Sequence, residues 1–147
     1  MTEFVTAGAG FLAAVLWFDL MFDVQVRRAE KREAAVASIS AYYRRVTIEA
    51  YPMNRLVAVV MVGTLAALIK QVVDGVAPRW ASITSLALAL VAIGLAVGHT
   101  FRTGARLGAG RATREEQAGL ARLILRDHLA CLAAIAAVLV LQLGFAR

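Results

Sequence analysis

The sequence has little of what several common kinds of protein require. Its 147 residues include one cysteine, two prolines and only ten acidic side chains. A single cysteine excludes an internal disulfide framework, CxxC redox chemistry and a zinc site made of several thiolates. The scarcity of proline and the long runs of Ala, Leu and Val exclude a disordered or collagen-like chain.

Charge is scarce as well, because 18% of the residues are charged whereas 61% are hydrophobic, with a mean hydropathy of +0.71. A soluble domain has roughly half apolar and about a quarter charged residues. A compact protein of 15.7 kDa has too small a core to bury this much apolar surface. The composition therefore predicts that lipid covers part of the chain.

Four apolar runs are long enough to cross a bilayer, which takes about 20 helical residues. They cover approximately residues 4–24, 53–73, 80–100 and 126–145. None of them alternates with the period of two that strands require. We therefore predict an all-α, four-span transmembrane bundle that forms a single integral membrane domain over residues 1–147.

Basic residues are concentrated on one side of this arrangement. Seven flank the connection between the first two spans and six flank the connection between the last two, leaving three of the sixteen for the other side. The thirteen are Arg27, Arg28, Lys31, Arg32, Arg44, Arg45, Arg55, Arg102, Arg106, Arg111, Arg114, Arg122 and Arg126.

Loops rich in Lys and Arg stay in the cytoplasm. We therefore predict a plasma membrane protein built as two helical hairpins, with long cytoplasmic connections and both termini outside. Trp80 then lies at the outer interface. The same basic connections are expected to contact anionic lipid, and no nucleic-acid-binding motif is present.

The long connections are themselves predicted to be partly helical. Thr113 and Glu116 have the spacing of a capping box, so the fourth helix is expected to extend well beyond the bilayer. Residues Val36, Ile39, Tyr43 and Val46 recur at helical spacing, which indicates an amphipathic segment at the headgroups or against a partner. Pro52 is expected to start or kink the second span. A flexible turn is predicted where glycines gather, at Gly104, Gly108 and Gly110.

Ionisable residues within the spans are the most informative positions, because each costs roughly 2.5–3.5 kcal/mol at mid-membrane. The spans contain Asp19, Asp23, His99, Asp127 and His128, all near the cytoplasmic boundary. Asp19 and Asp23 stand four residues apart on one helix face, where two carboxylates repel unless a cation or proton intervenes. We predict that these side chains meet at that end of the bundle.

Three interpretations of this cluster remain open. Asp and His are ligands for Zn, Mn or non-haem iron, and two histidines at similar depth suit a haem, so the five residues are candidate metal ligands. Their spacing matches no helical metal motif. The sequence instead favours a structural ion-pair network, in which Asp19 and Asp127 pair with arginines across helices. A protonated Asp19 is the third interpretation. The predicted network partners are Arg44, Arg45, Glu49, Asn54, Arg55 and Arg102.

Two further positions bear on packing. Gly94 and Gly98 have the GxxxG spacing that lets helices approach closely, which we expect first inside the chain and alternatively in an oligomer. Cys131 is expected to be a small apolar filler.

No strong catalytic signature is present. The leading hypothesis is therefore an accessory or oligomer-forming bundle whose polar cluster fixes helix packing and whose basic collar contacts a membrane-protein partner or anionic lipid. One alternative is a metal- or cofactor-dependent membrane enzyme or electron-transfer protein that uses the cluster. The other is a small proton-coupled transporter or channel working as an oligomer, with Asp19 as the coupling group.

Overall fold

The computed structural model describes residues 1–27, 32–49 and 51–146, and every regular element in them is helical. This confirms the all-α prediction. The elements, in chain order, are α1 (Thr2–Asp23), η1 (Val24–Arg27), α2 (Arg32–Arg44), η3 (Arg45–Glu49), α3 (Tyr51–Asp74), α4 (Arg79–Leu95), η4 (Ala96–Thr100), α5 (Phe101–Gly108) and α6 (Arg114–Phe145). η1 is a 3₁₀ turn, whereas η3 and η4 are π-helical turns.

Four helical stretches are long and apolar enough to cross a membrane, as predicted. They cover Thr2–Arg27, Pro52–Asp74, Arg79–Gly108 and Arg114–Phe145, and each contains one predicted span. Large apolar side chains face outward on them, including Phe4, Trp17 and Val73 with exposed fractions of 71%, 62% and 77%. Lipid is the solvent that suits such a surface.

The longest helix, α6, begins where the capping box was predicted. The hydroxyl of Thr113 accepts a hydrogen bond from the amide of Glu116, and the Glu116 carboxylate accepts one from the amide of Thr113 at 2.8 Å. These bonds satisfy amides that a helix start leaves without partners. The helix continues for 32 residues, or about 48 Å at 1.5 Å per residue.

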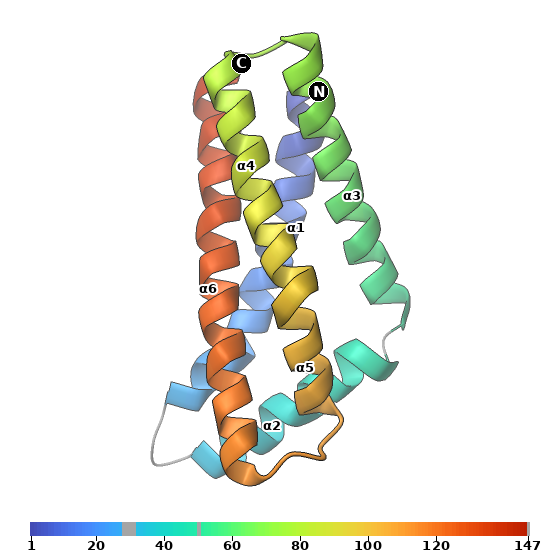
Figure 1. The fold of residues 1–147 in the computed structure, drawn as a ribbon, viewed down its shortest axis with the longest axis vertical. Helices are drawn as coiled ribbons and strands as arrows, with labels where there is room; N and C mark the ends of the chain where they lie inside the picture. The colour runs from blue at the N-terminus through green and yellow to red at the C-terminus, as the bar shows by residue number, and fades with distance from the viewer. Residues whose placement is uncertain (28–31, 50, 147) are drawn as a thin grey trace.

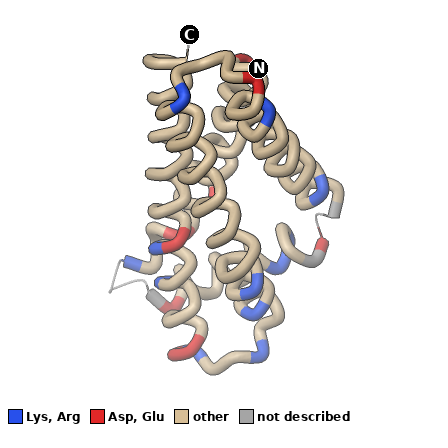
Figure 2. Tube along the Cα trace, turned by 45° about the horizontal axis from the view of Figure 1, so that its top comes forward, with Lys and Arg blue, Asp and Glu red and all other residues tan. Residues whose placement is uncertain are grey.

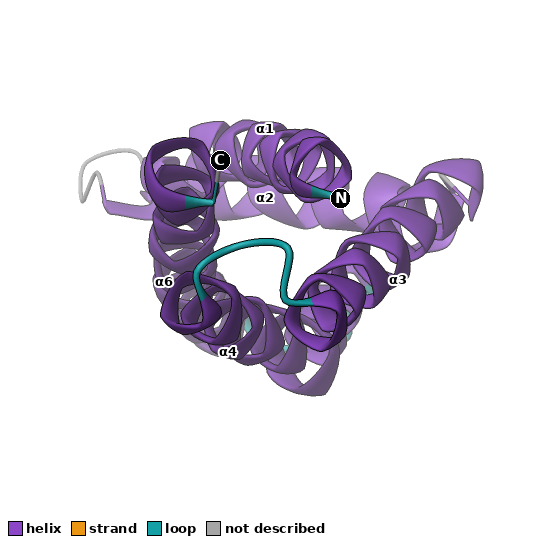
Figure 3. Ribbon diagram, turned by 90° about the horizontal axis from the view of Figure 1, so that it is seen from above, coloured by secondary structure: helices purple, strands orange, loops and turns teal. Residues whose placement is uncertain are grey.

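Four long helices form the bundle, with α6 packed against both α1 and α4, and α3 packed against the same two helices (Figure 3). Their shared core is apolar and built largely from small side chains. It includes Val5, Ala9, Leu68, Ala89 and Val138, all 0% exposed. α3 leans away from the other helices toward its N-terminal end (Figure 1).

α2 crosses one end of the bundle (Figure 1). We call this the α2 end, and the opposite end, where a short turn joins α3 to α4, the turn end. The predicted apolar face of α2 is buried by the same chain: Val36, Ile39 and Tyr43 pack in one cluster with Leu107 of α5 and Ile124 of α6.

The predicted glycine-rich turn is shorter than expected. Gly104 and Gly108 belong to the helix α5, and only Gly110, with φ +65°, lies in the turn that follows. The two helical glycines lie against α2, where a Cβ on Gly108 would come within 2.8 Å of the backbone nitrogen of Arg44. The glycines therefore permit close approach of two helices rather than a flexible turn.

Basic residues gather toward the α2 end, whereas Lys70 and Arg79 lie at the turn end (Figure 2). Trp80 also lies at the turn end, with its ring centroid 5.2 Å from that of Phe145. Of the predicted charge pattern, Arg28, Lys31 and Arg147 lie outside the described residues.

Candidate functional site

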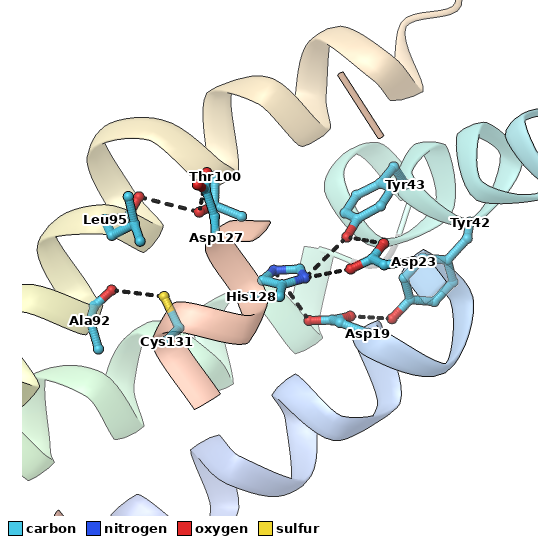
Figure 4. Close-up of polar contacts among 10 residues, drawn as sticks. All are labelled: Asp19, Asp23, Tyr42, Tyr43, Ala92, Leu95, Thr100, Asp127, His128 and Cys131. Carbon is cyan, nitrogen blue, oxygen red and sulfur yellow. Dashed lines mark hydrogen bonds and ion pairs between the residues drawn. The ribbon is translucent and has the colours of Figure 1, made fainter. Parts of the chain in front are cut away.

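The imidazole of His128 on α6 lies between two carboxylates of α1 (Figure 4). Its Nδ1 is 2.6 Å from Oδ2 of Asp23, and its Nε2 is 3.9 Å from Oδ2 of Asp19. The first distance is that of a charge-assisted hydrogen bond, whereas the second is an ion-pair distance. One histidine therefore joins both predicted carboxylates of the first span to the fourth span.

Two consecutive tyrosines of α2 complete this group. Tyr42 donates a hydrogen bond to Oδ1 of Asp19 at 2.5 Å, and Tyr43 donates one to Oδ1 of Asp23 at 3.0 Å (Figure 4). The Tyr43 hydroxyl also lies 3.5 Å from Nδ1 of His128. We call Asp19, Asp23, Tyr42, Tyr43 and His128 the Asp–His–Tyr cluster. It links α1, α2 and α6.

Local helix geometry explains why the tyrosines reach both acids. Asp19 and Asp23 are one helical turn apart, so their carboxylates are stacked along one face of α1. Adjacent residues on α2 point in different directions, which lets Tyr42 reach one acid and Tyr43 the other. The ring of Phe22 stacks on Tyr42 with a centroid distance of 4.2 Å and holds it beside α1.

Burial makes the charge of the cluster important. The side chain of Asp23 is 0% exposed, that of His128 is 8% exposed and that of Asp19 is 17% exposed. Two ionised carboxylates and one protonated imidazole leave one net negative charge, which is costly in a low-dielectric interior. One additional proton removes that charge. Burial, followed by the nearby carboxylates, also raises the pKa of the Tyr42 and Tyr43 phenols, so both remain hydrogen-bond donors at neutral pH.

A second titratable pair lies on the other side of α6. His99 and Asp127 form an ion pair, and the hydroxyl of Thr100 donates to Asp127 Oδ2 at 3.4 Å. The Asp127 side chain is 3% exposed, whereas that of His99 is 45% exposed. His99 and Thr100 both belong to the π-helical turn η4, whose extra residue changes the direction of the side chains that follow it.

The five predicted ionisable residues thus meet in two groups, with Asp19, Asp23 and His128 in one and His99 and Asp127 in the other. Among residues 1–27, 32–49 and 51–146, no group of three or more His, Cys, Asp or Glu side chains is arranged to hold a metal ion. The metal site stays a prediction from residue types.

The arginines predicted as network partners do not supply the contacts described above. Arg44 pairs with Glu49 at 3.4 Å, and both side chains are more than half exposed. Arg45, Arg55 and Arg102 are also exposed, and Asn54 is partly buried. Arg126 approaches another of the predicted acids, with its Nε 3.9 Å from Oδ1 of Asp127.

Sequence reasoning missed the role of the two tyrosines. Helical periodicity placed Tyr43 on the buried face of α2, where it was counted as an apolar residue. That burial was the sequence signal for its role in the cluster. A buried phenol requires a hydrogen-bond partner, and the unpaired acids of α1 are natural candidates. Combining the two patterns would have paired these residues.

The predicted packing residues have different surroundings. A Cβ on Gly94 or Gly98 would meet no atom within 4 Å among the described residues, so their close approach inside the chain is not observed. Close approach occurs at Gly104 and Gly108 instead. Cys131 is buried in the core, where its thiol donates to the carbonyl oxygen of Ala92 at 3.4 Å (Figure 4).

Comparison with other proteins adds no assignment. Family models, curated proteins and solved structures contain no match to this chain. The function is therefore argued from the geometry of the site.

Proposed function

We propose that the chain is a multi-pass protein of the plasma membrane, with the α2 end in the cytoplasm and both termini outside. The gathering of arginines at the α2 end supports this orientation, because positively charged segments stay on the cytoplasmic side. In this arrangement α1 and α3 form one hairpin and α4 and α6 form the other. Exposed arginines of the α2 end then contact anionic lipid or a membrane-protein partner.

We further propose that the protein is an accessory bundle whose Asp–His–Tyr cluster binds protons from the cytoplasmic side and thereby controls the docking of α2. The observation that carries this proposal is the bonding of Asp23. This fully buried carboxylate accepts from Tyr43 of α2 through one oxygen and contacts His128 of α6 through the other.

The chemistry of a carboxyl group links protonation to docking. An ionised carboxylate accepts hydrogen bonds at both oxygens, whereas the neutral acid turns one oxygen into a donor. Protonation of Asp23 therefore removes the charge that strengthens its contacts with Tyr43 and His128, and one of these two partners must change from donor to acceptor for its bond to persist. The ionisable groups that face it are Asp19 on α1, Tyr42 and Tyr43 on α2 and His128 on α6.

Asp19, unlike Asp23, can bind a proton without losing a hydrogen bond to α2. Its Oδ1 accepts from Tyr42 while its Oδ2 faces Nε2 of His128 across 3.9 Å. A proton on Oδ2 leaves the bond to Tyr42 intact and neutralises the cluster. We infer that Asp19 accepts the first added proton without releasing α2, and that protonation of Asp23 releases α2.

Proton transport is the second proposal that involves the same residues. Among the described residues, the buried core between the cluster and the turn end is apolar apart from Thr64, and includes Val5, Leu12, Ile135 and Val138. Protons do not cross such a core without polar groups or water. A transport function therefore requires a path between subunits of an oligomer.

The docking proposal is tested by measuring how far α2 lies from α6 at different pH values. Spin labels are attached to Ala41→Cys and Leu123→Cys, two exposed positions, in a Cys131→Ala background and in lipid nanodiscs. Electron paramagnetic resonance then gives the distribution of distances between the labels. We expect a narrow distribution at neutral pH that broadens to longer distances on acidification.

Variants separate this mechanism from general acid unfolding. Asp23→Asn carries no charge at any pH, so it lacks the charge-assisted contacts with Tyr43 and His128 and should give the broad distribution at every pH. Asp74→Asn removes an acid that pairs with Lys70 at the turn end and should respond like the parent protein. A narrow distribution in Asp23→Asn, or a parent distribution that ignores pH, contradicts the proposal.

A further inference from the structure

A second group of buried polar side chains lies at the turn end, separate from the Asp–His–Tyr cluster. Gln71, Ser82, Ser85 and Gln142 are all 0% exposed. Together with Thr2 they come from α1, α3, α4 and α6, and each lies within the first or last two turns of its helix. We call these five residues the turn-end polar layer. These residues take no part in the docking of α2.

Hydrogen bonds connect the helices through this layer. Thr2 donates to the carbonyl oxygen of Ala146 at 3.0 Å, and Gln71 Nε2 donates to the Thr2 hydroxyl oxygen at 3.5 Å. Gln142 Nε2 donates to the hydroxyl oxygen of Ser85 at 3.0 Å. Since Thr2 has already given its hydrogen to Ala146, it can only accept from Gln71. That contact fixes the Gln71 amide with its carbonyl oxygen directed away from Thr2.

Three buried polar atoms of the layer have no hydrogen-bond partner among the described residues. They are the carbonyl oxygens of Gln71 and Gln142 and the hydroxyl oxygen of Ser82. Buried polar atoms in native proteins are nearly always paired, with protein groups or with ordered water. Three such atoms in one layer therefore indicate that a bound molecule supplies the missing partners.

The chemistry of the three atoms restricts what that molecule is. Two amide oxygens need hydrogen-bond donors, and the Ser82 hydroxyl can either donate or accept. All five side chains of the layer are uncharged. Of the charged side chains next to the layer in sequence, Glu3 is exposed, and Lys70 pairs with Asp74 at 2.6 Å. A cation in the layer would have no carboxylate ligand from these five residues.

We propose that the turn-end polar layer is a binding site for a small neutral hydrogen-bond donor, and that the donor is water. A water molecule can donate to an amide oxygen and can accept from a hydroxyl, so water satisfies each of the three atoms. Apolar residues of the core, among them Val5, Leu68 and Val138, separate this site from the Asp–His–Tyr cluster. Gln142 and His128 are 14 positions apart on α6, or about 21 Å along the helix. The site is therefore independent of the cytoplasmic proton site.

Water-edited solid-state NMR on the full chain in lipid bilayers tests this site directly. The chain has four glutamines, Gln25, Gln71, Gln117 and Gln142, so selective labelling gives four side-chain amide signals. Magnetisation transferred from water should reach Gln71 and Gln142 as quickly as it reaches the partly exposed Gln25. Labelled Val138, one turn deeper on α6 than Gln142, should receive it far more slowly and serves as the dry control.

Two substitutions assign the signals, because Gln71→Leu and Gln142→Leu each remove one resonance. Transfer to Gln71 and Gln142 that is as slow as transfer to Val138 overturns the proposal. A chemical shift change of both amides on replacing choline chloride with sodium chloride also overturns it, because the occupant is then a cation. Either result leaves the pH response of α2 untouched, so the two proposals fail independently.

Discussion

His128 lies 2.6 Å from Asp23, although 105 positions separate them in the chain. The contact joins the end of the first span to the middle of α6 and places both groups away from solvent. Because Asp23 also accepts from α2, a single carboxylate holds three helices together. Substitution of either partner is therefore expected to affect both stability and the position of α2.

Replacing His128 with alanine should destabilise the fold strongly. The substitution leaves Asp23 buried without its imidazole partner, and breaking a buried pair in this way costs roughly 3–5 kcal/mol. Thermal unfolding in detergent or nanodiscs measures the loss. Lys70→Ala is the control, since it breaks a pair with Asp74 that is largely exposed, and such surface pairs contribute at most about 1 kcal/mol. Equal effects of the two substitutions contradict the central role assigned to His128.

Replacing Gly108 with alanine should displace α2 from α5. The new Cβ would lie 2.8 Å from the backbone nitrogen of Arg44, and backbone cannot move aside as a flexible side chain can. Overpacking of this kind costs about 1–3 kcal/mol.

Gly94→Ala is the matched control, because its Cβ would meet nothing within 4 Å among the described residues. Its unfolding temperature should stay the same or rise slightly, since alanine favours helix over glycine. If Gly108→Ala is as stable as Gly94→Ala, then α5 and α2 do not approach as described.

The phenols of Tyr42 and Tyr43 should ionise at higher pH than exposed tyrosines. Burial first, and then the neighbouring carboxylates, raise the pKa of both groups. Since their pKa in the unfolded chain is about 10, the stability they contribute is present below that pH. This stability is lost as the pH rises above the pKa of the unfolded chain, because the phenols of the unfolded chain release their protons at lower pH than those of the folded protein.

An ultraviolet titration of tyrosinate absorbance measures this ionisation. The late-ionising fraction should be absent from a Tyr42→Phe, Tyr43→Phe double variant. Asp19→Asn should lower the pH at which Tyr42 ionises, since it removes a neighbouring negative charge. If both phenols of the folded protein ionise at about pH 10, as exposed tyrosines do, then they are not buried beside the carboxylates of Asp19 and Asp23.

The positions of the four long helices can be predicted from the sequence. Hydropathy located all four spans, and the capping box of Thr113 and Glu116 located the start of α6. These features depend on neighbouring residues along one helix, so periodicity and local chemistry are sufficient to find them. A mean hydropathy of +0.71 likewise indicates that apolar side chains cover part of the surface, as Phe4, Trp17 and Val73 do.

The partners of the buried acids depend on contacts between helices, which a single sequence does not reveal. Charge alone favoured arginine for Asp19 and Asp127, yet Tyr42 bonds to Asp19 and His99 pairs with Asp127. Arg44 and Arg45 are exposed. The π-helical turn η4, which carries His99 and Thr100, has no signature in helical periodicity or in capping residues. Similarly, spacing alone did not distinguish Gly94 and Gly98 from Gly104 and Gly108.

The central claim of the proposed mechanism is that release of α2 is coupled to proton uptake by Asp23. Infrared difference spectroscopy of the protein in lipid, acidic minus neutral pH, measures this uptake through the carbonyl band of protonated carboxyl groups. The account predicts that this carbonyl band is weaker in Asp23→Asn than in the parent protein. Asp74→Asn is the control and should lose only the intensity contributed by the Asp74 carboxyl group at the turn end. A spectrum in which Asp23→Asn removes no band intensity would show that Asp23 takes up no proton, and would contradict the account.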